Sequence, residues 1–212
     1  MKIGVFPGSF NPVHIGHLAV ANYLAEFGGF DEIWFLISPK NPLKEAEDLM
    51  DHEFRLKLVE KAIENYPKFK TSTIEWDMPR PAYTVNTLQK LRMLFPDHSF
   101  ELIIGTDNWT TIHRWKDYRL ILKNFKTWVY PRLKTGKVDI NHPNAKLVFG
   151  APKIEVSSSA IREAFRQGKD MRFFMPAGIY EDVLAAGCFK KEELPDEEHR
   201  QDEIIDKLII DN

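Results

Sequence analysis

The chain alternates short, continuous apolar runs with longer stretches in which apolar residues recur every three or four positions. Continuous apolar runs are typical of strands buried on both faces of a sheet, and the three-to-four spacing is typical of helices with one buried face. The pattern predicts strands over residues 2–6, 33–37, 70–76, 100–104, 128–130, 147–149 and 153–156. It predicts helices over a segment between Pro12 and the glycines at 28–29, over 51–65 and 83–94, over a serine-capped segment ending at Gln167, and over 179–186.

Helices and strands alternate from the first residue onward, which predicts an α/β fold. The expected architecture is a Rossmann-like, doubly wound parallel sheet with helices on both faces, and ligands of such sheets bind beyond the carboxyl ends of the strands. The apolar positions predicted to recur at helical spacing and face the core are Val13, Leu18, Ala21, Leu24, Ala25, Phe54, Leu58, Ala62, Val85, Leu88, Leu91 and Leu94.

The composition is that of an ordinary globular protein, with 43% hydrophobic and 28% charged residues in 212 and a formal net charge of −2. Residues 190–212 hold nine acidic and four basic residues, a net −5, so the remainder carries +3. We therefore expect one domain over 1–189, followed by an acidic extension over 190–212. This extension is either solvated or a small amphipathic helix that docks on this chain or a partner. Basic residues are scattered, which argues against a nucleic-acid partner.

The single cysteine, Cys188, excludes an internal disulfide and fits a reducing compartment. The start of the chain lacks the pattern of a signal peptide, and no apolar run approaches the roughly 18 residues of a membrane span. These features predict a cytoplasmic protein with no membrane partner. They leave the oligomeric state open, a homo-oligomer included.

The strongest chemical signal is the segment GSFNPVHIGH at residues 8–17, which follows the first predicted strand and opens the first predicted helix. Gly8 allows a ligand to approach the backbone closely, and the free N–H groups at a helix start bind anions. His14 and His17 share one helical face, with Gly16 leaving room between them. Two imidazoles beside a phosphate chain can donate hydrogen bonds and, when protonated, offset negative charge.

Two alternatives compete with this phosphate-binding interpretation. The histidines can be a zinc pair or can have no functional role, although no acidic residue or cysteine nearby completes a zinc site. The patterns GxGxxG and GK[ST] do not accompany the segment, which argues against hydride transfer and against P-loop hydrolysis.

A second signal is the segment VSSSAIR at residues 156–162, directly before the predicted serine-capped helix. Serine hydroxyls and free N–H groups at a helix start bind phosphate, and Arg162 adds a permanent cation. Helix capping alone explains one serine, but it does not explain three serines followed by an arginine.

Together these two segments resemble the signature motifs of the HxGH nucleotidyltransferases, which are related to the class I aminoacyl-tRNA synthetases. The second motif is usually ISSTxIR, so Val156 and Ser159 are mild departures from it. The resemblance implies that His14, His17 and Arg162 are catalytic. It implies an ATP site formed by Gly8, Ser9, Phe10, His14, Gly16, His17, Gly105, Asp107, Ser157, Ser158, Ser159, Ile161 and Arg162.

Further segments resemble the nicotinate mononucleotide adenylyltransferases within that superfamily: SPKNPLK at 38–44, PAYTVNTL at 81–88, GTD at 105–107 and YPR at 130–132. Ala82 stands where that family usually has serine. The resemblance implies a substrate site formed by Lys44, Tyr83, Thr84, Trp115, Lys116 and Arg132. Without the resemblance, Lys44 reads as a solvated lysine, Thr84 as a helix N-cap and Trp115 as a core residue.

The reaction implied by the resemblance is transfer of AMP from ATP to nicotinate mononucleotide, in the biosynthesis of NAD. Mg²⁺ would accompany ATP as the cofactor, with no metal ligands from the protein. Other phosphate acceptors, such as nicotinamide mononucleotide or phosphopantetheine, stay open as alternatives, as do a cytidylyltransferase and a non-catalytic nucleotide sensor.

Overall fold

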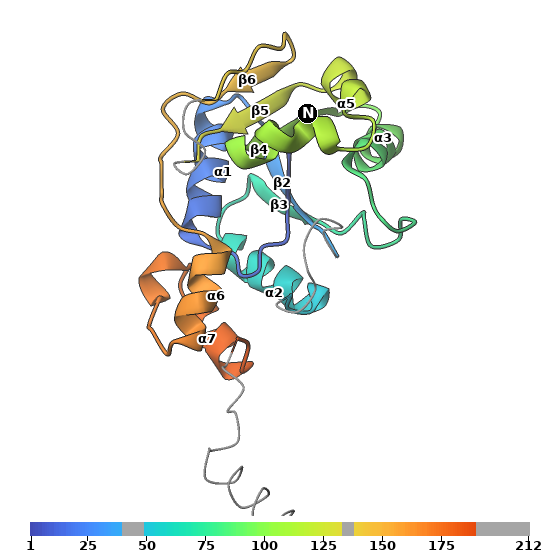
Figure 1. Cartoon of the computed structure of the whole chain (residues 1–212). Helices are drawn as coiled ribbons and strands as arrows, with labels where there is room; N and C mark the ends of the chain where they lie inside the picture. The colour runs from blue at the N-terminus through green and yellow to red at the C-terminus, as the bar shows by residue number, and fades with distance from the viewer. Residues whose placement is uncertain (40–48, 133–137, 190–212) are drawn as a thin grey trace, which may run out of the picture.

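The computed structural model describes residues 1–39, 49–132 and 138–189. Its sheet has six strands in the order β3-β2-β1-β4-β5-β6, and every neighbouring pair is parallel (Figure 1). The strands are β1 (Lys2–Gly8), β2 (Glu32–Ile37), β3 (Phe69–Ser72), β4 (Ser99–Gly105), β5 (Thr127–Tyr130) and β6 (Ala145–Leu147). This is the strand order of a doubly wound sheet, so the predicted Rossmann-like α/β fold is confirmed.

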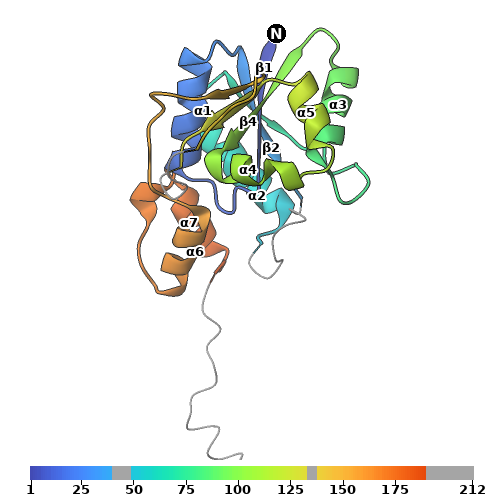
Figure 2. The same ribbon diagram turned by 45° about the horizontal axis from the view of Figure 1, so that its top comes forward.

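Helices cover both faces of the sheet, with α1 on one side and α3 and α5 on the other (Figure 2). The helices are α1 (Ile15–Phe27), α2 (His52–Ile63), α3 (Thr84–Leu94), α4 (Thr106–Thr111), α5 (Tyr118–Asn124), α6 (Ser158–Arg166) and α7 (Ile179–Ala185). Two short 3₁₀ turns, η1 (Ile112–Arg114) and η3 (Arg172–Phe174), complete the described elements. The α6–α7 pair lies at one end of the sheet (Figure 1).

The sheet separates two hydrophobic core clusters, one on each face. Phe6 of β1 packs in the cluster that includes α1 and α2. Ile3 and Val5 of the same strand pack in the cluster that includes α3 and α5. Alternate side chains of a strand point to opposite faces, so β1 is buried on both sides and its carboxyl end is held rigidly.

Three strand predictions need correction. The predicted strand at 70–76 ends at Ser72, because Thr73 begins a turn in which the N–H of Trp76 bonds to the Thr73 carbonyl at 2.8 Å. The predicted strand at 147–149 lies two residues earlier, as the short edge strand β6. The predicted strand at 153–156 is wrong, since this segment pairs with none of the described strands and runs on toward α6.

The helix predictions hold in outline. Leu94 is an exception among the predicted core positions, because it ends α3 with 52% of its surface exposed. The short helices α4 and α5 were not predicted, since neither is long enough to show a helical repeat of apolar residues.

Two expectations concern the chain's ends and environment. The predicted acidic extension over 190–212 lies outside the described residues. Within the described ranges, no helix has both the length and the apolar character needed to cross a bilayer.

Candidate active site

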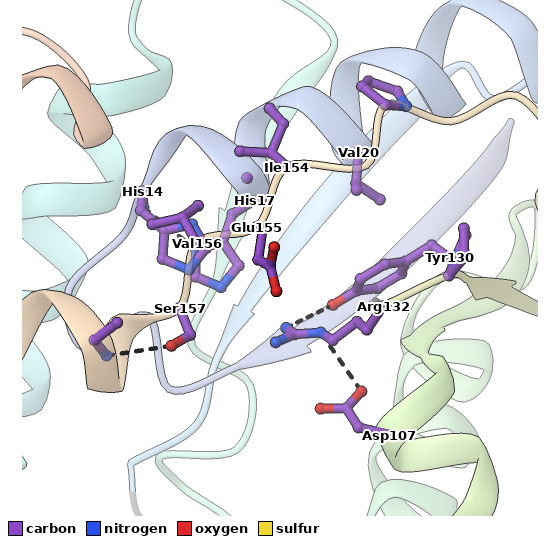
Figure 3. A pocket seen from close by; sticks show the side chains of 14 residues that line it. His14, His17, Val20, Asp107, Tyr130, Arg132, Ile154, Glu155, Val156 and Ser157 are labelled. Atoms are coloured by element: carbon purple, nitrogen blue, oxygen red, sulfur yellow. Dashed lines mark hydrogen bonds and ion pairs between the residues drawn. The ribbon is translucent and has the colours of Figure 1, made fainter. Parts of the chain in front are cut away.

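A cavity of about 250 Å³ opens where β4 and β5 end and α1 begins (Figure 3). Three separate stretches of the chain supply most of its wall: the first turns of α1, the residues after β4 and β5, and the segment leading into α6. This is the place where doubly wound sheets bind ligands. The lining residues that bear on the chemistry are His14, Gly16, His17, Asp107, Tyr130, Arg132, Glu155, Val156 and Ser157.

The two histidines of the first motif lie face to face at the start of α1. Their ring centroids are 3.7 Å apart, and the planes differ by 20°. The backbone N–H of His14 donates to Nδ1 of His17 at 3.3 Å. A neutral His17 therefore carries its proton on Nε2, which makes that nitrogen a hydrogen-bond donor. Phe10 packs edge-on against the His17 ring, with centroids 5.0 Å apart, and fixes its orientation.

His14 is uncharged at neutral pH. It is 3% exposed, and burial, followed by the positive charge of Arg132, lowers the pKa of His14 from 6.5 to about 3. The expectation that a protonated imidazole offsets negative charge therefore does not apply to His14. The His14 side chain faces the backbone N–H of His17, in the capping box at the start of α1.

Gly16 lies at a close contact between the two motifs. A Cβ at this position would lie 3.0 Å from the Val156 side chain and 3.1 Å from the His14 ring. Both contacts are tighter than normal packing, so a larger residue here would require the Val156 side chain or the His14 ring to shift.

The second motif folds back onto the first. Ser157 is the N-cap of α6, and its hydroxyl accepts the Ala160 N–H at 3.2 Å. The Ser158 hydroxyl donates to the Pro12 carbonyl at 3.0 Å. Arg162 donates through Nη1 to the Asn11 carbonyl, also at 3.0 Å. Residues about 150 positions apart in the sequence thus join two helix starts at one site.

The end of β5 contributes a positive charge to the cavity. Arg132 donates through Nη2 to the Tyr130 hydroxyl at 3.0 Å, and its Nε lies 3.5 Å from Oδ1 of Asp107. A Cβ on Gly105 would lie 2.3 Å from the same Asp107 oxygen, so only glycine leaves room for this ion pair. Figure 3 shows the Glu155 carboxylate, which comes from the segment before α6, among the side chains that line the cavity.

The other predicted ATP-site residues do not line the cavity but pack or bond behind its wall. The side chains of Phe10 and Ile161 are buried in the core, at 1% and 0% exposure. A Cβ on Gly8 would lie 2.7 Å from the Phe10 ring. The carbonyl of Ser9 accepts a hydrogen bond from Arg55, and the Ser159 hydroxyl lies 3.4 Å from Nη2 of Arg162.

The predicted substrate-site residues divide into two groups. Arg132 lines the cavity, whereas Tyr83 and Trp115 pack against the core cluster of α3 and α5. Lys116 lies beside this second group, with Nζ 5.2 Å from the Tyr83 ring centroid. Thr84 is the first residue of α3, but the N-cap is Tyr83, so the alternative reading of Thr84 as a cap is wrong. Lys44 lies outside the described residues.

Sequence reasoning missed Arg55, which is completely buried in α2. Its guanidinium donates to the carbonyls of Met50, Ser9, Ser38 and Pro39 at 2.7–2.9 Å. The signal was present in the sequence, because Arg55 precedes the buried Val59 by four residues and Ile63 by eight, and so shares their helical face.

No cluster of three potential metal ligands occurs in the ranges 1–39, 49–132 and 138–189. The zinc alternative for His14 and His17 therefore finds no third protein ligand there.

The fold and the paired helix starts define an α/β nucleotidyltransferase. The cytidylyltransferase-like family model matches residues 5–164. Among curated proteins, one named as a nicotinate-nucleotide adenylyltransferase from Azobacteroides pseudotrichonymphae is 55% identical over 184 residues, covering 87% of this chain and 97% of the relative. One of the same name from Bacteroides fragilis is 46% identical over 183 residues, covering 86% and 91%.

On these matches, the chain belongs to the nicotinate-nucleotide adenylyltransferase family, within the cytidylyltransferase-like nucleotidyltransferases. The fold is also that of the Plasmodium falciparum nicotinic acid mononucleotide adenylyltransferase complexed with NaAD, with a TM-score of 0.75. That structure is 19% identical, and the match covers 89% of this chain and 97% of the other. At this identity the likeness supports the fold alone.

Proposed function

We propose that this chain transfers AMP from ATP to nicotinate mononucleotide, giving nicotinate adenine dinucleotide and pyrophosphate for NAD biosynthesis. The observation that carries the proposal is the junction of the two motifs, made by the Ser158–Pro12 and Arg162–Asn11 hydrogen bonds beside the histidine pair. Membership in the nicotinate-nucleotide adenylyltransferase family supports this choice of substrates.

In the proposed reaction, a phosphate oxygen of the acceptor attacks the α-phosphorus of ATP. A new P–O bond forms, the bond to the β-phosphate oxygen breaks, and pyrophosphate leaves with the electron pair. The acceptor phosphate is already ionised at neutral pH, so no protein base is needed, and a neutral His14 is consistent with this chemistry. Catalysis then depends on positioning and on stabilising charge.

The two helix starts divide the triphosphate between them. The Nε2–H of His17 donates to the α-phosphate, where negative charge shifts during transfer. The start of α6 would hold the β- and γ-phosphates through backbone N–H groups, the hydroxyls of Ser157 and Ser159 and the Arg162 guanidinium, while the Ser158 hydroxyl holds the two motifs together. Arg162 already bonds to the Asn11 carbonyl, so its guanidinium is held close to the first motif.

The carboxylates on the cavity wall fit Mg²⁺ that arrives with ATP. Asp107 and Glu155 line the cavity, and Asp107 is paired with Arg132. Mg²⁺ commonly keeps several waters and takes only one or two carboxylates besides the phosphates of its nucleotide. Glu155 and Asp107 would hold its waters, and the ion would offset charge on the leaving pyrophosphate.

The acceptor approaches from the β5 and α3 side. Arg132 lines the cavity, its positive charge acts on His14, and it would hold the acceptor's phosphate. Tyr83, Thr84, Trp115 and Lys116 would receive the pyridine ring and its carboxylate, and Lys44 would reach the phosphate. A site that pairs a carboxylate rejects an analogue without one. We therefore expect preference for nicotinate over nicotinamide mononucleotide, and we place the reaction in the cytoplasm.

Mass spectrometry of the reaction products tests this function. The purified protein would be incubated with ATP, Mg²⁺ and one acceptor: nicotinate mononucleotide, nicotinamide mononucleotide or phosphopantetheine. The proposal expects the nicotinate dinucleotide to form fastest. Faster product formation from another acceptor would reassign the substrate. ATP binding without pyrophosphate release from any acceptor would indicate a sensor.

A further inference from the structure

Ser38, directly after β2, connects three separate parts of the chain through its three polar groups. Its N–H donates to the Gly8 carbonyl at 3.1 Å, beside the first motif. Its carbonyl accepts from Nη1 of Arg55 at 2.8 Å. Its hydroxyl bonds to the side chain of Glu75, in the turn after β3. A residue whose every polar group is used in this way fixes the positions of its partners relative to one another.

Arg55 extends this connection toward the ATP side. The same Nη1 that binds Ser38 also donates to the Ser9 carbonyl at 2.7 Å. The described residues include no ion pair to Arg55, although its side chain is completely buried. Burial lowers the pKa of Arg55 to about 10, so it stays charged at neutral pH. Lysine could not replace this planar fork, which serves four carbonyls at once.

Glu75 extends the connection toward the acceptor side. It is 4% exposed, and Oγ1 of Thr87 in the first turns of α3 donates to its carboxyl at 2.9 Å. The same hydroxyl lies 3.2 Å from the carbonyl of Tyr83, the N-cap of α3. The neighbouring Trp76 donates from its indole to the Ile37 carbonyl at 2.9 Å, which ties this turn to β2 a second time.

We propose that Ser38, Arg55, Glu75 and Thr87 form one buried positioning network that sets the spacing between the Gly8–Ser9 turn and the start of α3. This inference rests on the proposed function, in which the turn belongs to the ATP side and α3 to the acceptor side. None of the four side chains lines the cavity, so they act through the backbone that they hold. In-line transfer requires the acceptor phosphate at a fixed place relative to the α-phosphorus, and small misplacements are costly.

Steady-state kinetics of three variants, Ser38→Ala, Glu75→Gln and Thr87→Val, test the network. The matched control is Thr127→Val, because Thr127 is 1% exposed and its hydroxyl has no hydrogen-bond partner among the described residues. Losing a hydrogen bond to a buried carboxyl should raise the KM for nicotinate mononucleotide about tenfold in Thr87→Val, with the KM for ATP within about twofold. The control should change neither constant.

A double variant separates a connected network from independent contacts. Ser38→Ala and Thr87→Val interrupt the same path, so together they should raise the acceptor KM little more than either does alone. Multiplying effects would contradict the proposal. So would equal rises in both KM values, which indicate general loosening of the fold.

Hydrogen exchange provides a readout that does not depend on the reaction. Thr87→Val should speed exchange of the Ser38 N–H, and Ser38→Ala should speed exchange of the Asn86 and Thr87 N–H groups that bond to the Tyr83 carbonyl. Exchange in β5 should not change. Unaltered exchange at the far end of the path would overturn the network. If the unmodified protein forms no dinucleotide, the proposed function fails while this measurement still decides the network.

Discussion

Protonation of His14 should destabilise the fold on mild acidification. Burial, with a smaller contribution from Arg132, lowers the pKa of His14 from 6.5 to about 3. Between these values the unfolded chain binds a proton that the folded chain does not, so stability falls as pH decreases through that window. At about 1.4 kcal/mol per pH unit below 6.5, going from about pH 7 to pH 5 should cost roughly 2 kcal/mol.

Urea unfolding of the wild type and of His14→Asn at both pH values isolates this effect. Asparagine keeps a side chain suited to the N-cap but does not titrate, and the other groups titrate alike in both proteins. The wild type should lose roughly 2 kcal/mol more than the variant over this change. NMR titration of the seven histidines provides a direct control. Equal losses of stability in the two proteins, or a His14 signal that titrates near 6.5, would show that the fold does not hold His14 in its neutral form.

Three further substitutions test the motif residues. His17→Ala should lower kcat roughly 10²–10³-fold with little change in melting temperature, and near-normal turnover would remove His17 from the mechanism. Arg162→Lys should raise the KM for ATP about tenfold, because an ammonium cannot bind both the Asn11 carbonyl and a phosphate as a planar guanidinium can. An unchanged KM for ATP would argue against phosphate binding by Arg162. Gly8→Ala should cost about 1–3 kcal/mol in urea unfolding by displacing Phe10, and an unchanged midpoint would show that the ring can move.

The central strands could be predicted from the sequence because their environment is uniform. The runs at 33–37 and 102–104 lie in the middle of the sheet and are apolar at every position, so the pattern is unambiguous. The segment at 153–156 also alternates like a strand. An alternating segment forms a strand only where a neighbouring strand is available for pairing. Residues 154–156 instead line the wall of the cavity.

The two motifs could be recognised from local sequence, and the family resemblance predicted that they meet at one ATP site, but the hydrogen bonds that join them could not be predicted. Ser158 and Arg162 bond to the backbone carbonyls of Pro12 and Asn11. Every residue has a backbone carbonyl, so the sequence does not show which of them accept these bonds. The same limit hid the contacts of Arg55, whose partners are all carbonyl groups, although its place on the buried face of α2 could be predicted from the sequence. The neutral state of His14 was also hidden, because burial follows from packing between distant segments.

A crystal structure with Mg²⁺ and a non-hydrolysable ATP analogue would show whether the two helix starts bind one triphosphate. We expect the α-phosphate within hydrogen-bond distance of Nε2 of His17, and the β- and γ-phosphates at the first turn of α6 beside Arg162. A triphosphate bound away from either helix start would contradict this expectation.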